Sequence, residues 1–153
     1  LLPLLDSSGR VVNLSSAAQS PVELKALNGQ ITLSDDFAAY AQSKLALTMW
    51  SRKMGLSFKD KGAQIIAVNP GSLLGSKMVK EGFGVEGADI SIGAEILVRA
   101  ALADEFATAS GLYFDNDSKQ FSAPHTDALD SQKADEVVQA IETVLAEKLA
   151  NKS

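Results

Sequence analysis

The chain has 153 residues, of which 46% are hydrophobic, and this is enough for one ordinary domain with its own core. Its net charge of −5 argues against a nucleic-acid partner, because phosphate binding needs a clustered basic face and the 14 Lys and Arg residues are scattered. No apolar run approaches the roughly 18 residues that a membrane-spanning helix needs, and the absence of cysteine excludes disulfides and fits a cytoplasmic location.

The first part of the chain predicts one strand and one long helix. Residues 10–16, RVVNLSS, form a β-branched run that is typical of a buried strand. Residues 17–33 contain a proline and an Asn-Gly turn signal, so we expect irregular structure there. A helix is predicted at about 37–58, with Ser-Asp-Asp before it as the cap. The opening LLPLL is interpreted as the end of a helix whose beginning is absent.

The second part predicts two more strands and two helices. Residues 63–71, AQIIAVNPG, are a second apolar strand ended by Asn-Pro-Gly, and a Gly-rich loop follows. We expect a helix at about 91–104, a third strand in GLYFDND and a last helix at about 131–149. The apolar residues at helical spacing are Ile92, Ile96, Leu97 and Ala100 in the first helix and Val137, Val138, Ile141, Val144 and Leu145 in the second.

Strands that alternate with helices of a dozen or more residues predict right-handed βαβ crossovers and a parallel sheet. The runs VVNL and IIAV are apolar at nearly every position, as expected when helices cover both faces of the sheet. Ligands bind such sheets beyond the carboxyl ends of the strands. This rule singles out Ser15, Ser16, Asn69, Pro70 and Gly71, which stand where the first two strands end.

Tyr40 and Lys44 lie four residues apart in the sequence YAQSK, so both side chains project from one face of the predicted helix. A free tyrosine is a poor base at neutral pH, but a nearby cation favours its phenolate form. Such a pair can exchange a proton with a carbonyl or alcohol oxygen. The spacing alone more often reflects a half-buried tyrosine that packs on the sheet and a lysine that extends into water.

Three segments together resemble the catalytic half of the short-chain dehydrogenase/reductase (SDR) family. They are VVNLSS with Ser16, YAQSK with Tyr40, Ser43 and Lys44, and VNPGSLLGSKM with Pro70, Gly71 and Ser76. They occur in the family's order on the expected elements, and the resemblance covers the whole chain. NPGSLLGSKM and GLYFDND look closest to the branch that includes retinol-dehydrogenase-like members.

The resemblance implies an oxidoreductase that interconverts a carbonyl and an alcohol by hydride transfer with NAD or NADP. Tyr40 would be the general acid/base, and Lys44 would favour its phenolate form and hold the nicotinamide ribose. Ser16 would hydrogen-bond the substrate oxygen, where charge develops, and Ser15 is the fallback if the register differs by one residue.

The same resemblance implies that the Asn-Pro-Gly loop contacts the cofactor. Pro70, Gly71 and the backbone at Leu73 would line the nicotinamide pocket, because glycine lets the main chain come close and proline fixes the turn. Ser76 stands where the family often has a threonine that contacts the carboxamide. The segment GSLLGS is one residue longer than the commonest spacing in the family.

The family's fold begins with a strand, a Gly-rich dinucleotide turn and a helix, and the sequence contains no match to them. The literal G-x-G-x-x-G at 82–87, GFGVEG, follows polar residues instead of a strand, so we interpret it as part of a flap over the substrate site. The family's catalytic asparagine has no match either, since Asn13 lies inside a predicted strand. We therefore expect residues 1–153 to be the C-terminal, catalytic and substrate-binding portion of one Rossmann-like α/β domain. It would hold about three strands of a doubly wound parallel sheet with flanking helices.

An incomplete domain needs partners. As the first strand, VVNL would expose an unpaired apolar edge, so either the missing N-terminal half or another copy of the chain would cover it. Leu45, Met49 and Trp50 are candidates for a homo-oligomer interface, or plain core. Loops 17–33 and 77–90 should shape the pocket for a small carbonyl or alcohol, and their apolar residues Leu24, Leu27, Met78, Val79 and Phe83 favour an apolar substrate.

Other polar residues indicate less. His125 is the single histidine, and no serine is arranged with it as in a hydrolase triad. Asp115, Asn116 and Asp117 fit a capped turn better than a calcium loop, so no metal site is predicted. Two functions stay open: an NAD(P)-dependent oxidoreductase, of which this chain is a part that is inactive alone, and a catalytically inactive SDR-like binding or scaffold protein.

Overall fold

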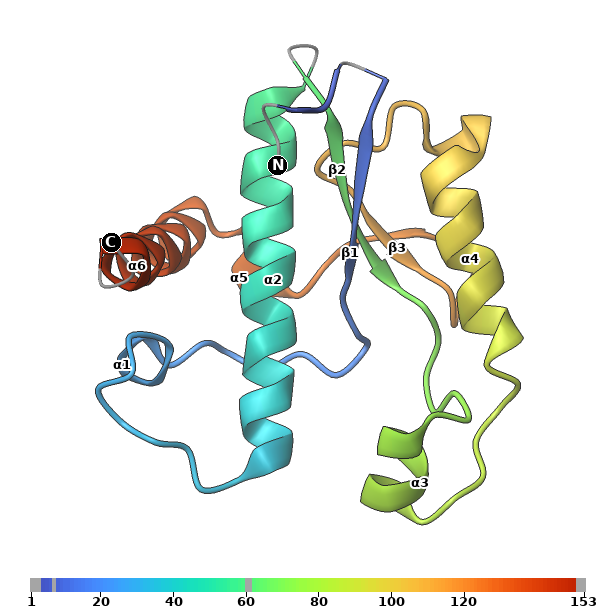
Figure 1. The fold of residues 1–153 in the computed structure, drawn as a ribbon, viewed down its shortest axis with the longest axis horizontal. Coiled ribbons are helices and arrows are strands. Elements are labelled where there is room, and N and C mark those ends of the chain that lie inside the picture. Colours follow the sequence, from blue (N-terminus) through green and yellow to red (C-terminus); the bar gives the residue numbers. More distant parts are fainter. Residues whose placement is uncertain (1–3, 7, 60–61, 151–153) are drawn as a thin grey trace.

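The computed structural model of the chain describes residues 4–6, 8–59 and 62–150. It contains a four-stranded sheet with helices on both faces (Figure 1). The elements in chain order are β1 (Arg10–Leu14), α1 (Leu24–Leu27), α2 (Asp36–Phe58), β2 (Gln64–Asn69), α3 (Lys77–Phe83), α4 (Ser91–Leu102), the 3-10 turn η2 (Asp104–Phe106), β3 (Tyr113–Asp115), β4 (Gln120–Ser122), α5 (Thr126–Leu129) and α6 (Ser131–Ala150). This is a partial Rossmann-like fold, as the sequence predicts. The expected helix end in LLPLL falls mainly on residues 1–3, which lie outside the described residues.

The strands lie in the order β1-β2-β3-β4. β1 pairs with β2 and β2 with β3 in parallel, and Asn13, Ala67 and Tyr113 are partners across these three strands. β4 pairs with β3 in antiparallel orientation. The predicted parallel sheet is therefore confirmed for three strands. β4 is an additional strand, which the sequence does not reveal because its three residues are too few for an alternating pattern.

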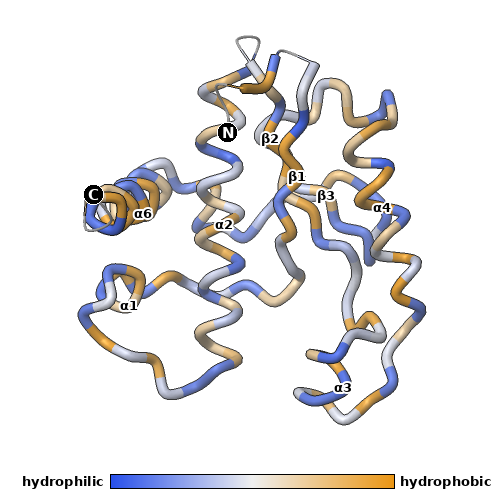
Figure 2. Tube along the Cα trace, in the orientation of Figure 1, coloured by the Kyte–Doolittle hydropathy of each residue, from blue (hydrophilic) through white to orange (hydrophobic). Residues whose placement is uncertain are grey.

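Two clusters of buried side chains form the core. The first packs β2 and β3 against α4 and consists of Ile66, Val68, Ile96, Ala100, Phe106, Ala109 and Phe114. The second packs α2 against α5 and α6 and consists of Leu45, Ala46, Met49, Ala128, Ala134 and Val137. Apolar stretches accordingly follow the strands and α4 in Figure 2, and α2 stands between the sheet and α6.

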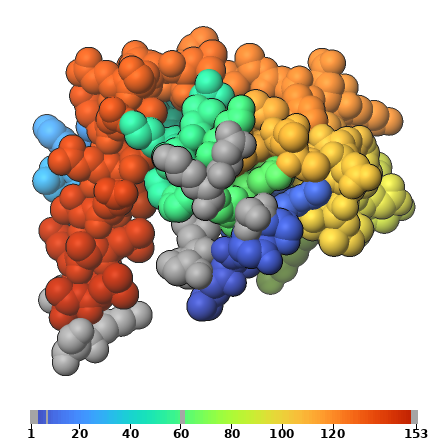
Figure 3. All heavy atoms as spheres, turned by 90° about the horizontal axis from the view of Figure 1, so that it is seen from above, coloured from blue at the N-terminus to red at the C-terminus, as the bar shows by residue number. Residues whose placement is uncertain are grey.

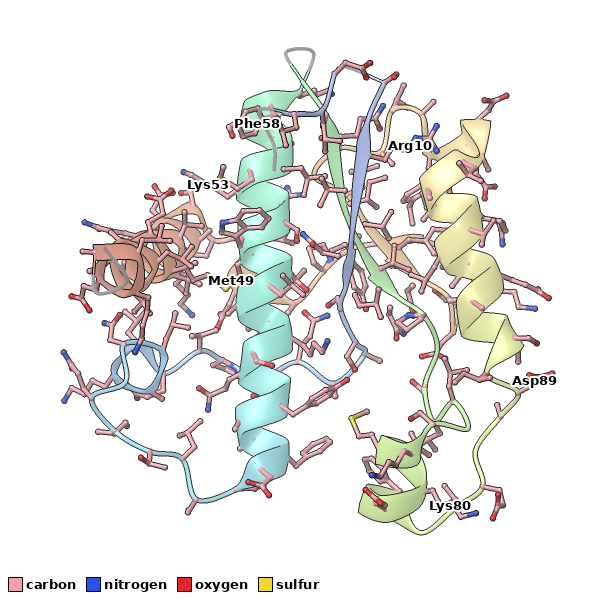
Figure 4. All side chains as sticks on the ribbon, in the orientation of Figure 1. Arg10, Met49, Lys53, Phe58, Lys80 and Asp89 are labelled. Carbon is pink, nitrogen blue, oxygen red and sulfur yellow. The ribbon has the colours of Figure 1, made fainter. Side chains whose placement is uncertain are left out.

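Leu45 and Met49 belong to this second cluster, and Trp50 is half-buried. Figure 4 shows Met49 and Lys53 on the side of α2 that faces α6, where Lys53 forms an ion pair with Asp135. Leu45 and Met49 are therefore plain core, which is the second of the two alternatives that the sequence leaves open, because the chain's own core buries both side chains.

The predicted apolar faces of the two later helices are correct except near helix ends. Ile96 and Ala100 of α4 and Val137 of α6 are buried, but Ile92 is 44% exposed and Leu145 is 54% exposed. Ile92 is the second residue of α4, and Leu145 lies in the last part of α6. The C-terminal end of α6 projects beyond the rest of the molecule (Figure 3). The exposure of Leu145 follows from this, because that part of the helix has little to pack against.

β1 lies at the edge of the described sheet, where β2 is its only partner strand. Its residues are mostly half-buried, whereas β2 is almost entirely buried. Arg10 at its start donates to the carbonyls of Ala100 (3.2 Å) and Ala103 (2.7 Å) near the end of α4. The other edge of β1 therefore presents unpaired backbone groups within the described structure, as the sequence predicts.

Candidate active site

Polar segments meet at the carboxyl ends of β1, β2 and β3. Ser15, the first residue after β1, donates its N–H to the carbonyl of Val68 on β2 (2.8 Å). At the end of β2, the carbonyl of Asn69 accepts from the N–H of Asn116, which follows β3 (3.1 Å). The parallel pairing thus continues beyond the strands and holds the three loops side by side. Ligands of parallel sheets bind at this edge.

Tyr40 and Lys44 occupy the side of α2 that faces the end of β1. The Lys44 ammonium lies 5.5 Å from the centroid of the Tyr40 ring. It also donates to the carbonyl of Leu14, the last residue of β1, at 2.8 Å. No described residue hydrogen-bonds the Tyr40 hydroxyl. The lysine therefore joins the phenol to the end of β1, and the phenol keeps its capacity to bond a ligand.

The two serines after β1 differ in what their hydroxyls contact. The Ser15 hydroxyl is buried and lies 2.6 Å from the hydroxyl of Thr48 on α2. The Ser16 hydroxyl accepts from the N–H of Ala18 (3.1 Å), so its own hydrogen is still available to a ligand. Ser16 is therefore the better candidate for a substrate contact, and the fallback Ser15 is occupied inside the molecule.

The Asn-Pro-Gly loop is fastened to the β3–β4 turn by hydrogen bonds. The Asn69 amide donates to Asp115 (2.8 Å) and to Asp117 (2.9 Å), and Asp117 also accepts from the backbone N–H (2.8 Å) and hydroxyl (2.5 Å) of Ser72. Burial tends to raise the pKa of Asp117, but the bonds from Ser72 and Asn69 outweigh burial and hold this pKa below its usual value. Asp115 and Asp117 thus anchor the loop, as expected for a capped turn.

The residues predicted to contact the cofactor lie on this loop. Gly71 has a φ of 130°, a conformation that favours glycine, and Leu73 has a φ of 51°. The Ser76 hydroxyl accepts from the N–H of Val79 (3.3 Å) and caps α3. No hydrogen bond between described residues joins Pro70, Gly71, Leu73 or Ser76 to Tyr40 or Lys44. The cap explains the hydroxyl at position 76 without a cofactor.

The literal G-x-G-x-x-G match does not form a phosphate cradle. Gly82 lies inside α3, and Gly84 ends that helix in the left-handed conformation. The match belongs to a longer loop, residues 75–88, whose two ends are joined because the N–H of Gly75 donates to the carbonyl of Ala88 (2.6 Å). The segment packs toward α2 through Phe83, whose ring centroid lies 6.1 Å from that of Phe37. It therefore has the position of a flap beside the N-terminal end of α2.

Tyr113 on β3 is a further polar residue at this edge, and sequence reasoning gave it no role. Its hydroxyl donates to the carbonyl of Ser16 at 3.2 Å, and its side chain is 8% exposed. Burial, followed by the negative charges of Asp115 and Asp117, raises the pKa of Tyr113 to about 12. The contact depends on strand order and register, so the sequence carries no direct signal of it.

The raised pKa predicts that the free energy of unfolding falls as the pH increases from about 10 to about 12. In this window an unfolded tyrosine has released its proton, because its ordinary pKa is 10.0, whereas folded Tyr113 still holds its proton. Rising pH therefore stabilises the unfolded state relative to the folded state. Below pH 10 the protonated Tyr113 makes its full contribution to the free energy of unfolding. Because solvent partly screens the side chain, we expect the contribution lost at higher pH to be about 1–2 kcal/mol. Urea unfolding at about pH 9 and about pH 11.5 measures it, and Tyr113→Phe should show a smaller decrease. An equal decrease in both proteins would contradict this prediction.

A groove elsewhere in the molecule contains none of the residues predicted to act in catalysis or to bind the cofactor. Its volume is about 380 Å³, and it lies between α1 and α6 with Leu24, Ala140 and Val144 among its lining residues. His125 has a structural role away from the candidate site. Its ring nitrogen accepts a hydrogen bond from the N–H of Asp127 (3.2 Å) and thereby caps α5.

A mostly parallel sheet, with Ser16 after its first strand and Tyr40 and Lys44 on the helix beside that strand's end, is the Rossmann-like arrangement that the sequence resemblance to the SDR family predicts. Two curated relatives are similar to the chain. Retinol dehydrogenase 13 from Homo sapiens is 26% identical over 136 residues, which are 77% of this chain and 40% of the relative. Retinol dehydrogenase 13 from Mus musculus is 28% identical over 141 residues, which are 82% of this chain and 42% of the relative.

The chain thus spans about two fifths of the length of these curated relatives. Retinol dehydrogenase 13 is an SDR, so the resemblance to this family that the sequence indicates is confirmed. SDR enzymes generally use NAD or NADP.

A solved structure shows the same fold. The crystal structure of an uncharacterized protein from Mycobacterium paratuberculosis matches with a TM-score of 0.67 and 22% identity, over 88% of this chain and 49% of that one. No protein-family model matches the chain. Among the described residues, every helix is too short or too polar to cross a bilayer.

Proposed function

We propose that this chain is the catalytic part of an NAD(P)-dependent oxidoreductase that interconverts a carbonyl and an alcohol. One observation carries the proposal: Lys44 contacts both the Tyr40 ring, at 5.5 Å, and the carbonyl of Leu14, at 2.8 Å. Leu14 is followed directly by Ser15 and Ser16. A single ammonium group therefore links the candidate acid/base to the segment with the candidate substrate-binding hydroxyl.

The roles follow from these contacts. Tyr40 gives a proton to the substrate oxygen in reduction and takes it back in oxidation, through a hydroxyl that no described residue occupies. The positive charge of Lys44 lies beside the Tyr40 ring, where it can stabilise negative charge that develops there as the proton moves. The Ser16 hydroxyl donates its hydrogen to the same substrate oxygen and stabilises the charge that develops there.

The residues present fit the nicotinamide end of the cofactor. NAD or NADP, when bound, would supply or accept the hydride. Lys44 has three N–H donors and uses one for Leu14, so the others can hold ribose hydroxyls. Pro70, Gly71 and Leu73 form a turn with positive φ angles at Gly71 and Leu73, and the proposal assigns the backbone of this turn to the nicotinamide pocket. Ser76 keeps its hydroxyl hydrogen for the carboxamide while its oxygen caps α3.

A further part of the proposal concerns partners. We propose that the free edge of β1 is covered by an N-terminal dinucleotide-binding half, and that the 153-residue chain alone is inactive. Half-buried Val11 and Val12 on β1 support this, because apolar edge strands are rarely left open. Pairing with a second copy at the same edge is the alternative. The cytoplasm is the proposed location.

The substrate is proposed to be apolar. Met78 and Phe83 of α3 are 53% and 51% exposed, and Phe37, one turn before Tyr40 on α2, is 54% exposed. The Phe83 ring packs edge-on against Phe37, so apolar surface close to the candidate acid/base is open to a ligand. Leu24 and Leu27 do not contribute, contrary to expectation, because both pack against the core cluster of α2 and α6.

The decisive experiment expresses the complete polypeptide that carries these residues and measures oxidation of NADH and NADPH with a series of aliphatic and aromatic carbonyl compounds. We expect turnover with one of the two nucleotides and none with the 153-residue chain alone. Nucleotide binding without turnover would favour the catalytically inactive binding protein. Failure to bind either nucleotide would contradict the oxidoreductase proposal.

A further inference from the structure

Three elements hold the two serines that follow β1. From α2, the Thr48 hydroxyl bonds the Ser15 hydroxyl (2.6 Å). From β2, the carbonyl of Val68 accepts from the Ser15 N–H (2.8 Å). From β3, the Tyr113 hydroxyl donates to the Ser16 carbonyl (3.2 Å). The first two contacts fix Ser15, whereas the third acts on Ser16 itself.

Tyr113 reaches Ser16 from two strands away because the residue between them is small. Asn13, Ala67 and Tyr113 are register partners on β1, β2 and β3, and partners across a sheet point to the same face. The bond from Asn13 to Ser51 (2.8 Å) shows that this face is the one covered by α2. Ala67 contributes only a methyl group there, which leaves room for the Tyr113 ring to extend toward Ser16.

The surroundings keep the Tyr113 hydroxyl a donor. Its side chain is nearly buried, and the carboxylates of Asp115 and Asp117 oppose its ionisation. Gln19 donates to the same Ser16 carbonyl at 2.8 Å. Two donors from different segments therefore converge on one carbonyl, and this geometry restrains the rotation of the Ser16 peptide. The Ser16 hydroxyl, attached to that residue, is restrained with it.

We propose that Tyr113 is a positioning residue: its hydroxyl holds the Ser16 carbonyl and thereby aims the Ser16 hydroxyl at the substrate oxygen. The inference rests on the proposed function, since it assigns Tyr113 a role only through Ser16. Tyr113 itself does not take part in proton transfer.

The first test compares kinetics of the complete polypeptide with Tyr113→Phe, which removes the hydroxyl and keeps the ring. We expect kcat to fall about five- to fiftyfold with little change in KM, because a misaimed Ser16 loses stabilisation mainly in the transition state. The matched control is Ser110→Ala, which removes a buried hydroxyl that donates to the Gly55 carbonyl (2.9 Å) near the opposite end of the sheet. It should leave kcat unchanged, and an equal fall in both variants would overturn the proposal.

The second test needs no enzyme activity. Amide hydrogen exchange of the 153-residue chain reports on the Ala18 N–H, which donates to the Ser16 hydroxyl (3.1 Å). Tyr113→Phe should speed exchange at Ala18 about fivefold, which is the effect of one net hydrogen bond, and Ser110→Ala should not. Unchanged exchange at Ala18 would overturn the proposal. Faster exchange in a protein whose complete polypeptide shows no turnover would refute the proposed function and still support the contact between Tyr113 and Ser16.

Discussion

Tyr40→Phe should lower kcat of the complete polypeptide about a hundred- to ten-thousandfold, because the substitution removes the group that exchanges a proton with the substrate oxygen. The ring remains, so its contact with the Lys44 ammonium at 5.5 Å should persist and the fold should not change. KM for the nucleotide should change little, since Lys44 keeps its bond to the Leu14 carbonyl. Steady-state kinetics of purified wild type and variant, with unfolding curves for both, provide the measurement.

The chain offers a matched control for this substitution, since Tyr113→Phe makes the same atomic change 73 positions further along the sequence. Tyr40 acts on the substrate, whereas Tyr113 acts through Ser16, so the loss for Tyr40 should exceed the loss for Tyr113 by about tenfold or more. A Tyr40→Phe variant with more than about a tenth of wild-type kcat would show that another group moves the proton.

The part of the site that the sequence predicts is local. Tyr40 and Lys44 are one helical turn apart, and the helix needs only its Asp35 cap and its length to place them on one face. The ends of β1 and β2 follow from apolar runs that stop at Ser15 and at Asn-Pro-Gly. Helical spacing and strand ends are properties of a few consecutive residues, so the pattern alone places them correctly.

The part that the sequence does not predict depends on contacts between distant segments. Tyr113 meets Ser16 only because β3 lies beside β2 in a particular register, with Ala67 between them. Leu45 and Met49 have the same apolar character whether they pack against α6 or against a second copy, and only the position of α6 decides. Register and helix docking are set by the sum of many long-range contacts, which no short motif records.

The contact between α2 and the sheet at Gly55 is another long-range feature, and we expect Gly55→Ala to destabilise the fold by about 3 kcal/mol or more. A Cβ at this position would lie 2.3 Å from the backbone nitrogen of Gly111 and 2.8 Å from the carbonyl oxygen of Ile65. Both are backbone atoms, and the Gly111 N–H is itself bonded to Ile65 (2.8 Å), so neither can turn aside as a side chain would. Urea unfolding followed by circular dichroism measures the loss.

Gly82→Ala is the matched control, because a Cβ at Gly82 in α3 would meet nothing within 4 Å. There the better helix propensity of alanine should act alone and stabilise by about 0.5–1 kcal/mol. Alanine at position 55 has the same helix-propensity advantage. A net decrease in the free energy of unfolding of Gly55→Ala therefore equals the cost of the steric clash minus this advantage. Since α2 also carries Tyr40, about four turns before Gly55, relief of the clash by tilting the helix would move Tyr40 relative to Ser16. A Gly55→Ala protein that is as stable as wild type and keeps its kcat would therefore show that α2 does not need this close approach to the sheet.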